Sequence, residues 1–328
     1  MRSAVWLDAR PIEWCVYCQP VPINVWIPAG TAPEHRALLP GGIAVHQLPA
    51  AGPLPDRLGR GEFLIADYNP PRVIESIHRL DDLRVVQAMA AGVDWLLDAI
   101  PSGVTLCDGA GVHDVPVAEW VVMTMLAAYH NLPTYVDAQR RERWHRGGID
   151  AGGDDLEGTT VLIVGYGSIG RAVEARLTSF GVKLLRVARH PREGVHPLSE
   201  LAALLPEADV VVILLPLTAE TRRLVDARFL SAMRPGALLI NPARGAIVDT
   251  EALTGAVLAS RLRAALDVTD PEPLPDGHPL WSAPGVLITP HVAGSVRKLL
   301  DRAWRLIADQ VRRYQIGDPL RNVVVDGY

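Results

Sequence analysis

The hexapeptide GYGSIG at residues 165–170 constrains the fold of this chain more than any other segment. It follows four apolar residues, 161–164, that we predict to be a buried strand, and it precedes a helical segment. In this order Gly165 permits a tight turn, Gly167 lets backbone N–H groups approach a pyrophosphate, and Gly170 lets helix and strand pack closely. A glycine loop between a strand and a helix indicates dinucleotide binding far more specifically than the hexapeptide alone.

Short apolar segments alternate with helical or turn segments on both sides of this loop, which indicates parallel sheets covered by helices. In the first region the candidate strands are 23–27, 44–48, 63–66, 84–88 and 105–107; in the second they are 160–164, 183–187, 210–214, 237–241, 264–267 and 286–289. We therefore predict an α/β fold of two domains. A Rossmann-type doubly wound sheet for the dinucleotide would span residues 113–295, and a smaller flavodoxin-like α/β substrate domain would combine residues 1–112 and 296–328.

Two helical segments connect these regions. Residues 115–144 form a long helical stretch that is broken near 131–133, and its middle, 120–129, is apolar nearly all round, which predicts burial between other elements. The basic run 140–146 is typical of a solvated helix face. A last helix, 296–314, is long enough to cross back and pack on the first region.

Composition excludes several function classes. The 328 residues carry 32 basic and 37 acidic side chains, a net charge of −5, so no nucleic-acid footprint is expected. Cys15, Cys18 and Cys107 are too few for a disulfide framework, which favours a reducing compartment. Cys15 and Cys18 form a CxxC pair, but neither a second pair for zinc nor a redox context accompanies it, so no metal is predicted.

The N-terminal part has no charge from residue 15 to residue 33, close to the length of a membrane span. Four prolines in that stretch make a spanning helix implausible, and the charges in residues 1–20 are unlike a secretory signal. We therefore predict a cytoplasmic protein with no membrane partner, whose first 20 residues are an extension of unknown purpose.

The end of the strand after the glycine loop predicts which dinucleotide is preferred. An acid at this position would bind a free ribose 2′-hydroxyl, but the chain has Arg189 and Arg192 instead. Their guanidinium groups suit a 2′-phosphate, so we expect NADP(H) to be preferred, with NAD(H) as the alternative. Otherwise the two arginines lie on a solvated turn of an arginine-rich protein.

Three further segments follow strands of the nucleotide domain: NPARG at 241–245, DVTDPEP at 267–273 and TPH at 289–291. Ligands of such sheets bind at the carboxyl ends of the strands. These segments are therefore expected to converge near the nicotinamide end of a bound dinucleotide.

Residues 60–328, which contain these segments, resemble the D-isomer-specific 2-hydroxyacid dehydrogenase family. The resemblance rests on several independent motifs in the right order: AGVD at 91–94, GYGSIG, PLTAET at 216–221, NPARGAIVD, DVTDPEP and TPH. The longer stretch DVTDPEPLPDGHPLW is similar to the glyoxylate and hydroxypyruvate reductase branch, which commonly favours NADPH. This resemblance implies an oxidoreductase that reduces a small 2-oxo acid to the D-2-hydroxy acid.

By this resemblance Arg244 would bind the substrate carboxylate, and His291 would protonate the carbonyl oxygen as general acid and act as base in reverse. Glu272 would orient the ring of His291 and favour its imidazolium form. Ala91, Gly92 and Val93 would offer backbone N–H groups to the carboxylate. Asp267 would contact the nicotinamide carboxamide.

The expected cofactor contacts extend over several loops. They include the three glycines of the loop, Arg189, Arg192, Arg244, Asp267 and His291. They also include Ser168, Ile169, Leu215, Pro216, Thr221, Pro242, Ala243 and Gly294. His113 and His278 are predicted to be non-catalytic, and substrate specificity is expected in loops near Tyr68, Asn69 and Trp95, whose shape the sequence does not give.

Departures from other members of the family together favour a reductase of small 2-oxo acids: formate dehydrogenases carry Gln in place of Glu272, phosphite dehydrogenases a Lys in the 90–92 loop, and D-3-phosphoglycerate dehydrogenases usually an Arg there. A D-3-phosphoglycerate- or phosphite-type dehydrogenase and a non-catalytic NAD(P)-sensing protein are the alternatives. A non-catalytic NAD(P)-sensing protein of the same fold need not keep Arg244, Glu272 and His291. Family members are mostly homodimers, and the helix 120–129 with the region of Trp144 would suit such an interface.

Overall fold

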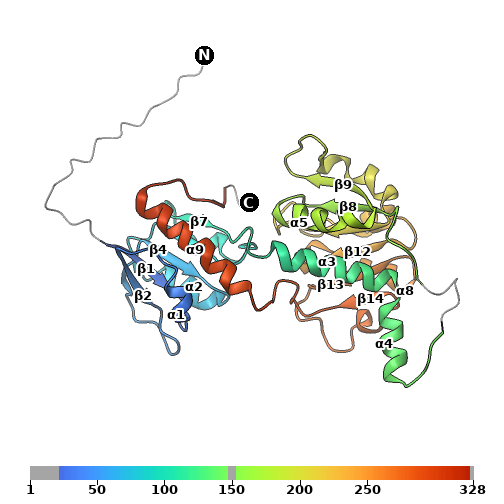
Figure 1. The fold of residues 1–328 in the computed structure, drawn as a ribbon, viewed down its shortest axis with the longest axis horizontal. Helices are drawn as coiled ribbons and strands as arrows, with labels where there is room; N and C mark the ends of the chain where they lie inside the picture. Colours follow the sequence, from blue (N-terminus) through green and yellow to red (C-terminus); the bar gives the residue numbers. More distant parts are fainter. Residues whose placement is uncertain (1–21, 147–152, 326–328) are drawn as a thin grey trace, which may run out of the picture.

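The computed structural model describes residues 22–146 and 153–325, which form two lobes that lie side by side (Figure 1). The first lobe is built on a five-stranded parallel sheet with the strand order β2-β1-β4-β6-β7. This order is the flavodoxin-like one, as predicted. Its strands are β1 (Ile23–Ile27), β2 (Ile43–Gln47), β4 (Phe63–Ala66), β6 (Val85–Ala88) and β7 (Thr105–Cys107).

The helices of the first lobe cover this sheet on both faces. They are α1 (Pro33–Arg36), α2 (Pro70–Ile77), the 3₁₀ helix η1 (Leu97–Ala99) and α9 (Leu299–Ile316), with a small ladder of β3 (Gly59–Arg60) and β5 (Leu80–Asp81) at the side. In α9 the apolar residues recur at helical spacing, and Ala303, Trp304, Ile307 and Val311 are buried against the first sheet. Figure 1 shows this C-terminal helix, in red, lying across the first lobe, so the end of the chain returns to its beginning.

The second lobe contains a seven-stranded parallel sheet with the order β10-β9-β8-β11-β12-β13-β14. The first six strands have the Rossmann order, and β14 extends the sheet at one edge. The strands are β8 (Thr160–Val164), β9 (Lys183–Ala188), β10 (His196–Pro197), β11 (Val210–Ile213), β12 (Leu238–Asn241), β13 (Arg263–Leu266) and β14 (Val286–Ile288).

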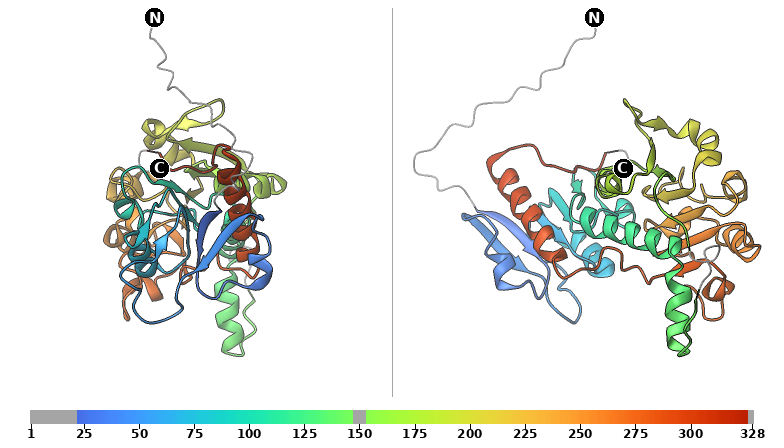
Figure 2. Two further views of the ribbon diagram at one scale, coloured as in Figure 1. Left: turned by 90° about the vertical axis from the view of Figure 1, so that its left-hand side faces the viewer. Right: turned by 45° about the vertical axis from the view of Figure 1, so that its right-hand side comes forward.

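Helices cover both faces of this sheet (Figure 2). Two buried apolar clusters lie between these helices and the sheet. The α-helices are α3 (Asp114–Tyr129), α4 (Leu132–Arg140), α5 (Ser168–Leu177), α6 (Leu201–Leu204), α7 (Ala227–Ala232) and α8 (Thr250–Leu258). Short 3₁₀ turns accompany them: η3 (Thr178–Phe180), η4 (Leu198–Glu200), η5 (Leu205–Glu207), η6 (Gly245–Ile247) and η7 (Pro279–Ser282). Gly181 ends the segment after α5 with φ 67°, in the left-handed conformation that glycine favours.

The helical stretch 115–144 was predicted too long. It is broken at Asn131, with φ 52°, as expected, but α4 ends at Arg140, and residues 141–146 are exposed and not helical. Like charges three positions apart, as in Arg140, Arg143 and Arg146, disfavour a continuing helix. The burial expected for 120–129 is incomplete as well, because Met123 is 52% exposed on a face of α3 that no other described element covers.

The other boundaries differ by a few residues at most, and the last helix begins at Leu299 rather than at Val296 because hydrogen-bonded turns occupy 292–298. Over the described residues, no helix combines the length and apolar character needed to cross a bilayer. Cys15, Cys18 and the N-terminal extension lie outside the described residues. Across 22–146 and 153–325, no three His, Cys, Asp or Glu side chains gather as a metal-binding group.

Candidate active site

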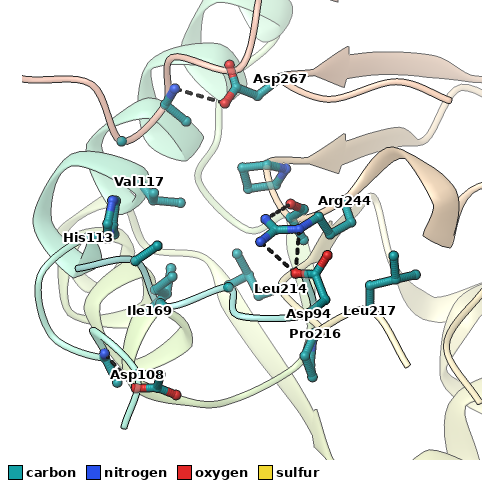
Figure 3. Close-up of a pocket in the computed structure, with 18 of the residues that line it drawn as sticks. Asp94, Asp108, His113, Val117, Ile169, Leu214, Pro216, Leu217, Arg244 and Asp267 are labelled. Carbon is teal, nitrogen blue, oxygen red and sulfur yellow. Dashed lines mark hydrogen bonds and ion pairs between the residues drawn. The ribbon is translucent and has the colours of Figure 1, made fainter. Parts of the chain in front are cut away.

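A cavity of about 750 Å³ lies between the two lobes, at the carboxyl ends of strands from both sheets (Figure 3). We refer to it as the interdomain pocket. On the first lobe it is lined mainly by the loops that follow β4, β6 and β7; on the second, by the glycine loop and the loops that follow β11, β12, β13 and β14. Ligands of parallel sheets bind at these strand ends, so the pocket is where the predicted site residues were expected.

The glycine loop has the close approaches that a dinucleotide site requires. Gly165 has φ 105°, and a Cβ there would be 2.5 Å from the carbonyl carbon of Leu214; a Cβ on Gly170 would be 3.1 Å from the carbonyl oxygen of Gly165. A Cβ on Gly167, by contrast, would meet nothing within 4 Å, because this residue faces the pocket where α5 begins. A helix N-terminus beside open space fits a pyrophosphate, so the residues present fit the dinucleotide.

Arg189 and Arg192 follow β9 beside this loop, and both are exposed outside the lining of the pocket. The Arg192 guanidinium donates a hydrogen bond to the carbonyl oxygen of Tyr166 (2.9 Å) and lies over the Tyr166 ring, 5.3 Å from its centre. A third arginine near this loop, Arg186, donates two hydrogen bonds to the carboxylate of Glu174, so its charge is paired within the lobe.

Most other predicted cofactor residues line the pocket: Ser168, Ile169, Leu215, Pro216, Pro242, Ala243 and Gly294. Thr221 does not. It is buried, and its hydroxyl donates to the carbonyl oxygen of Pro216 (2.6 Å), so it holds the loop that follows β11.

Arg244 enters the pocket from the loop after β12, and its guanidinium is held from three sides. Its Nε and Nη2 both donate to Asp94 Oδ1 (3.0 and 2.9 Å), and its Nη1 donates to the carbonyl oxygen of Ala243 (2.8 Å). The guanidinium lies directly over Gly92, where a Cβ would be only 1.7 Å from Nη2. The arginine of one lobe is thus placed against the AGVD turn of the other, of which Ala91 and Gly92 line the pocket and Val93 is fully buried.

His291 and Glu272 form the predicted pair. His291 Nδ1 lies 2.7 Å from Glu272 Oε1, and both side chains are partly exposed, at 48% and 43%. With Nδ1 bonded to the carboxylate, the other ring nitrogen remains available for a substrate. His291 lines the pocket, whereas Glu272 is not among its lining residues.

Asp267 has a structural role that the sequence did not indicate. Its side chain is buried; Oδ1 accepts hydrogen bonds from the Thr289 hydroxyl (2.5 Å) and the N–H of Val292 (2.8 Å), and Oδ2 accepts from the N–H of Ala293 (2.8 Å). Its carbonyl oxygen accepts from the N–H of His291 (2.7 Å). Asp267 therefore fixes the loop that carries His291, in addition to lining the pocket.

Comparisons with known proteins decide the family. Residues 122–293 match the family model described as "D-isomer specific 2-hydroxyacid dehydrogenase, NAD binding domain". The chain belongs to the D-isomer-specific 2-hydroxyacid dehydrogenase family. A glycerate dehydrogenase from Methylorubrum extorquens is 31% identical to this dehydrogenase over 278 residues, which cover 82% of this chain and 87% of that protein.

Solved structures agree with this assignment over nearly the whole chain. A D-isomer specific 2-hydroxyacid dehydrogenase from Xanthobacter autotrophicus Py2, solved with NADPH and MES, superposes with a TM-score of 0.80 at 30% identity, covering 94% of this chain and 100% of that one. An NADPH-dependent glyoxylate/hydroxypyruvate reductase from Sinorhizobium meliloti, solved with NADP and sulfate, gives 0.78 at 27% identity, with coverage of 94% and 100%. The chain is thus an oxidoreductase of a family that uses NAD(P).

The pocket of the dehydrogenase also contains residues for which no role was predicted. Asp94 was noted only as part of a motif, Asp108 was not singled out, and His113 was expected to be non-catalytic; all three line the pocket. Asp94 and Asp108 follow strands of the first sheet, and His113 immediately precedes α3. Their positions near strand ends could have marked them in the sequence as pocket residues. His278 lies elsewhere, where its ring accepts the N–H of Leu280 and caps η7.

Burial shifts two of these groups in opposite directions. Burial raises the pKa of the Asp108 carboxyl to about 6, although a hydrogen bond from the N–H of Ala110 acts to lower that pKa. Burial lowers the pKa of the His113 imidazole to about 4, and the positive charges of Arg244, Arg302 and His291 lower it further. Both groups therefore resist ionisation in the folded dehydrogenase.

Asp108→Asn is expected to stabilise the dehydrogenase above pH 6 and to leave its stability unchanged near pH 4. The folded pKa is raised above the usual value of 3.8, so folding favours the protonated carboxyl, and the ionised carboxylate costs up to about 3 kcal/mol at pH 7. Asparagine resembles the protonated acid and avoids this cost. The difference in unfolding free energy between the variant and the original chain, from urea titrations at pH 4 to 8, should rise from near zero through pH 4–6.

Asp98→Asn, a change at an exposed acid of the same lobe, is the matched control and should give no comparable rise. A flat difference for Asp108→Asn would show that water reaches this carboxylate in the folded state.

Proposed function

We propose that this dehydrogenase reduces a small 2-oxo acid of the glyoxylate or hydroxypyruvate type to the D-2-hydroxy acid, with NADPH as the preferred cofactor. One observation carries the proposal: Arg244 lies over Gly92, 2.9 Å from Asp94, in the same pocket as His291, whose Nδ1 is held by Glu272. A carboxylate clamp beside an oriented histidine suits a 2-oxo acid.

Each of these residues has a separate role in reducing the 2-oxo acid. Arg244 holds the substrate carboxylate from one side, and the backbone of Ala91 and Gly92 meets it from the other. His291 gives a proton from Nε2 to the carbonyl oxygen, and Glu272 keeps the ring turned to do so. Bound NADPH supplies the hydride. Closure of the two lobes would exclude water from the site.

The preference for NADPH is supported by charge. No acid follows β9 where a free 2′-hydroxyl would need one, and Arg192 is already placed beside the glycine loop through the carbonyl oxygen of Tyr166. Relatives named as NADPH-dependent reductases, or solved with NADPH, are consistent with this preference.

We further propose the domain limits 1–112 with 296–328 and 113–295, a cytoplasmic location and a homodimer. A dimer is supported by an apolar groove between α3, α4 and α5, where Met123 and Leu132 are 52% and 51% exposed, and by Trp144 nearby in the chain, at 91%. D-3-phosphoglycerate-type and phosphite-type dehydrogenases, and a non-catalytic NAD(P) sensor, are the alternatives. Arg244 and His291 line one pocket and Glu272 contacts His291, which speaks against the sensor.

The test mixes the purified protein with NADPH, or separately NADH, and measures the fall in absorbance at 340 nm with glyoxylate, hydroxypyruvate, pyruvate, 3-phosphohydroxypyruvate or phenylpyruvate. A separate assay offers phosphite with NAD⁺ or NADP⁺ and measures the rise in absorbance at the same wavelength. Turnover of a small 2-oxo acid, faster with NADPH, is the expected result. Silence with all of these despite measurable NADPH binding would favour the sensor.

Arg189→Ala is expected to raise the KM for NADPH roughly 10-fold or more and to leave the KM for NADH nearly unchanged. The expected loss is that of charge-assisted hydrogen bonds to the 2′-phosphate, which NADH lacks. Initial rates at varied cofactor concentration measure both constants, and Arg228→Ala, at an exposed arginine of α7, is the matched control. Equal losses for both cofactors would mean that Arg189 does not contact the 2′-phosphate.

A further inference from the structure

One wall of the interdomain pocket has no role in the proposed reaction, and it carries two polar side chains, His113 and Tyr68. His113 immediately precedes α3, and Tyr68 follows β4. The Tyr68 hydroxyl lies 3.4 Å from His113 Nε2, and the two rings meet edge to face with centroids 6.3 Å apart. A separation of 3.4 Å is long for a hydrogen bond to a hydroxyl, so the two groups are near each other but not fully satisfied.

The surroundings of His113 determine which edge of its ring faces the pocket. Nδ1 is buried and has no hydrogen-bond partner among the described residues. On another side the ring touches Gly294, where a Cβ would be 2.6 Å from the ring carbon Cδ2. Of the two ring nitrogens, Nε2 is therefore the one that lies near the Tyr68 hydroxyl, and both residues line the pocket.

Both side chains are uncharged at neutral pH. Burial is the main cause that lowers the pKa of His113 to about 4, and burial raises the pKa of Tyr68 to about 12. The guanidinium of Arg302 adds to the positive field at His113 but does not line the pocket. The wall therefore offers one imidazole and one phenol, which donate and accept hydrogen bonds but carry no formal charge.

The geometry of the proposed reaction sets which part of a substrate meets this wall. A 2-oxo acid has a planar carbonyl carbon with three neighbours in the plane and the hydride arriving from one face. Arg244 and Gly92 hold the carboxylate and His291 meets the carbonyl oxygen, so the remaining in-plane neighbour, C3 and its substituent, points toward what is left of the lining. Figure 3 shows His113 and Arg244 on opposite sides of the pocket.

We propose that His113 and Tyr68 form a subsite that binds a hydroxyl group on C3 of the substrate, so that the preferred substrates are 3-hydroxy-2-oxo acids. A hydroxyl both donates and accepts, so from the pocket side it can contact Nε2 and the phenol at once and supply the partner that their long 3.4 Å separation leaves wanting. A methyl group there would leave both polar groups without partners, which disfavours the deoxy analogue. A substrate with a second anionic group on C3 is disfavoured, because His113 and Tyr68 offer no positive charge to it. This inference rests on the proposed function.

The test compares hydroxypyruvate with pyruvate, which differ only by the C3 hydroxyl, in the full-length enzyme with NADPH. The ratio of kcat/KM for hydroxypyruvate to that for pyruvate is expected to be well above one and to fall roughly 10-fold or more in His113→Leu. Tyr68→Phe, which removes only a hydroxyl, should lower the ratio in the same direction. His113→Gln, whose amide can reach the position of Nε2, should retain most of the ratio.

His78→Leu, the same change at an exposed histidine after α2, is the matched control. A ratio near one in the original enzyme, or a ratio unchanged in both His113→Leu and Tyr68→Phe, would overturn the subsite. Equal losses for both substrates would assign the pair a purely structural role and overturn it too. These outcomes leave the proposed function standing, whereas absence of turnover with every 2-oxo acid would overturn the proposed function and the subsite together.

Discussion

Replacing His291 by alanine is expected to lower kcat for 2-oxo acid reduction by about 10²–10⁴-fold, the usual cost of losing a general acid. His291 lines the pocket with Nδ1 bonded to Glu272 at 2.7 Å, so Nε2 is the nitrogen left to protonate the carbonyl oxygen. No other described histidine is held by a carboxylate in this pocket: His113, which also lines it, contacts Tyr68 and is neutral at pH 7.

The measurement is kcat at saturating substrate, together with the dissociation constant of NADPH from fluorescence titration. NADPH binding should persist, because the glycine loop does not depend on His291. His78→Ala, an exposed histidine of the other lobe, is the matched control and should keep full turnover. Near-normal kcat in His291→Ala would remove this residue from the mechanism, whereas parallel loss of NADPH binding would show that the loop after β14 had collapsed.

Local patterns in the sequence predicted the elements of this fold and most of its pocket. The strand Thr160–Val164 is almost wholly apolar and runs directly into Gly165, and the glycine loop fixes where a dinucleotide would meet the sheet. Because parallel strands place their carboxyl ends at one edge, the sequence alone predicts that segments as far apart as 241–245 and 289–291 lie together.

Contacts between the lobes could not be predicted in the same way. The pair Arg244–Asp94 joins residues 150 positions apart, and it depends on how two separate sheets are placed against each other. The same holds for His113, whose ring touches Gly294 and faces Tyr68. Neither the periodicity of apolar residues nor the spacing of motifs predicts how the two lobes are placed against each other. The shifted pKa values of Asp108 and His113 arise mainly from burial in the folded protein, so they could not be predicted from the sequence either.

Gly92→Ala is expected to lower kcat/KM for the 2-oxo acid about 100-fold while leaving NADPH binding and the fold intact. The added Cβ would lie 1.7 Å from Arg244 Nη2 and 2.6 Å from its Cζ, so the guanidinium has to move, whereas the backbone of residue 92 is not in a left-handed conformation that alanine resists. Only the end of a flexible side chain is displaced, which costs little stability. For catalysis, a displacement of about 1 Å in a substrate clamp is worth roughly 10²-fold.

A matched control and a double variant separate this explanation from general damage. Gly41→Ala adds a Cβ where nothing lies within 4 Å, and it should change neither activity nor melting temperature. Arg244→Lys loses the planar fork that Asp94 and a carboxylate both require, and it should be impaired similarly. If Gly92→Ala acts through Arg244, the double variant will be little worse than either single one, because the second change removes an interaction already lost. Fully additive losses would mean that the AGVD turn and Arg244 serve the substrate independently, and that the guanidinium's position over Gly92 is incidental to catalysis.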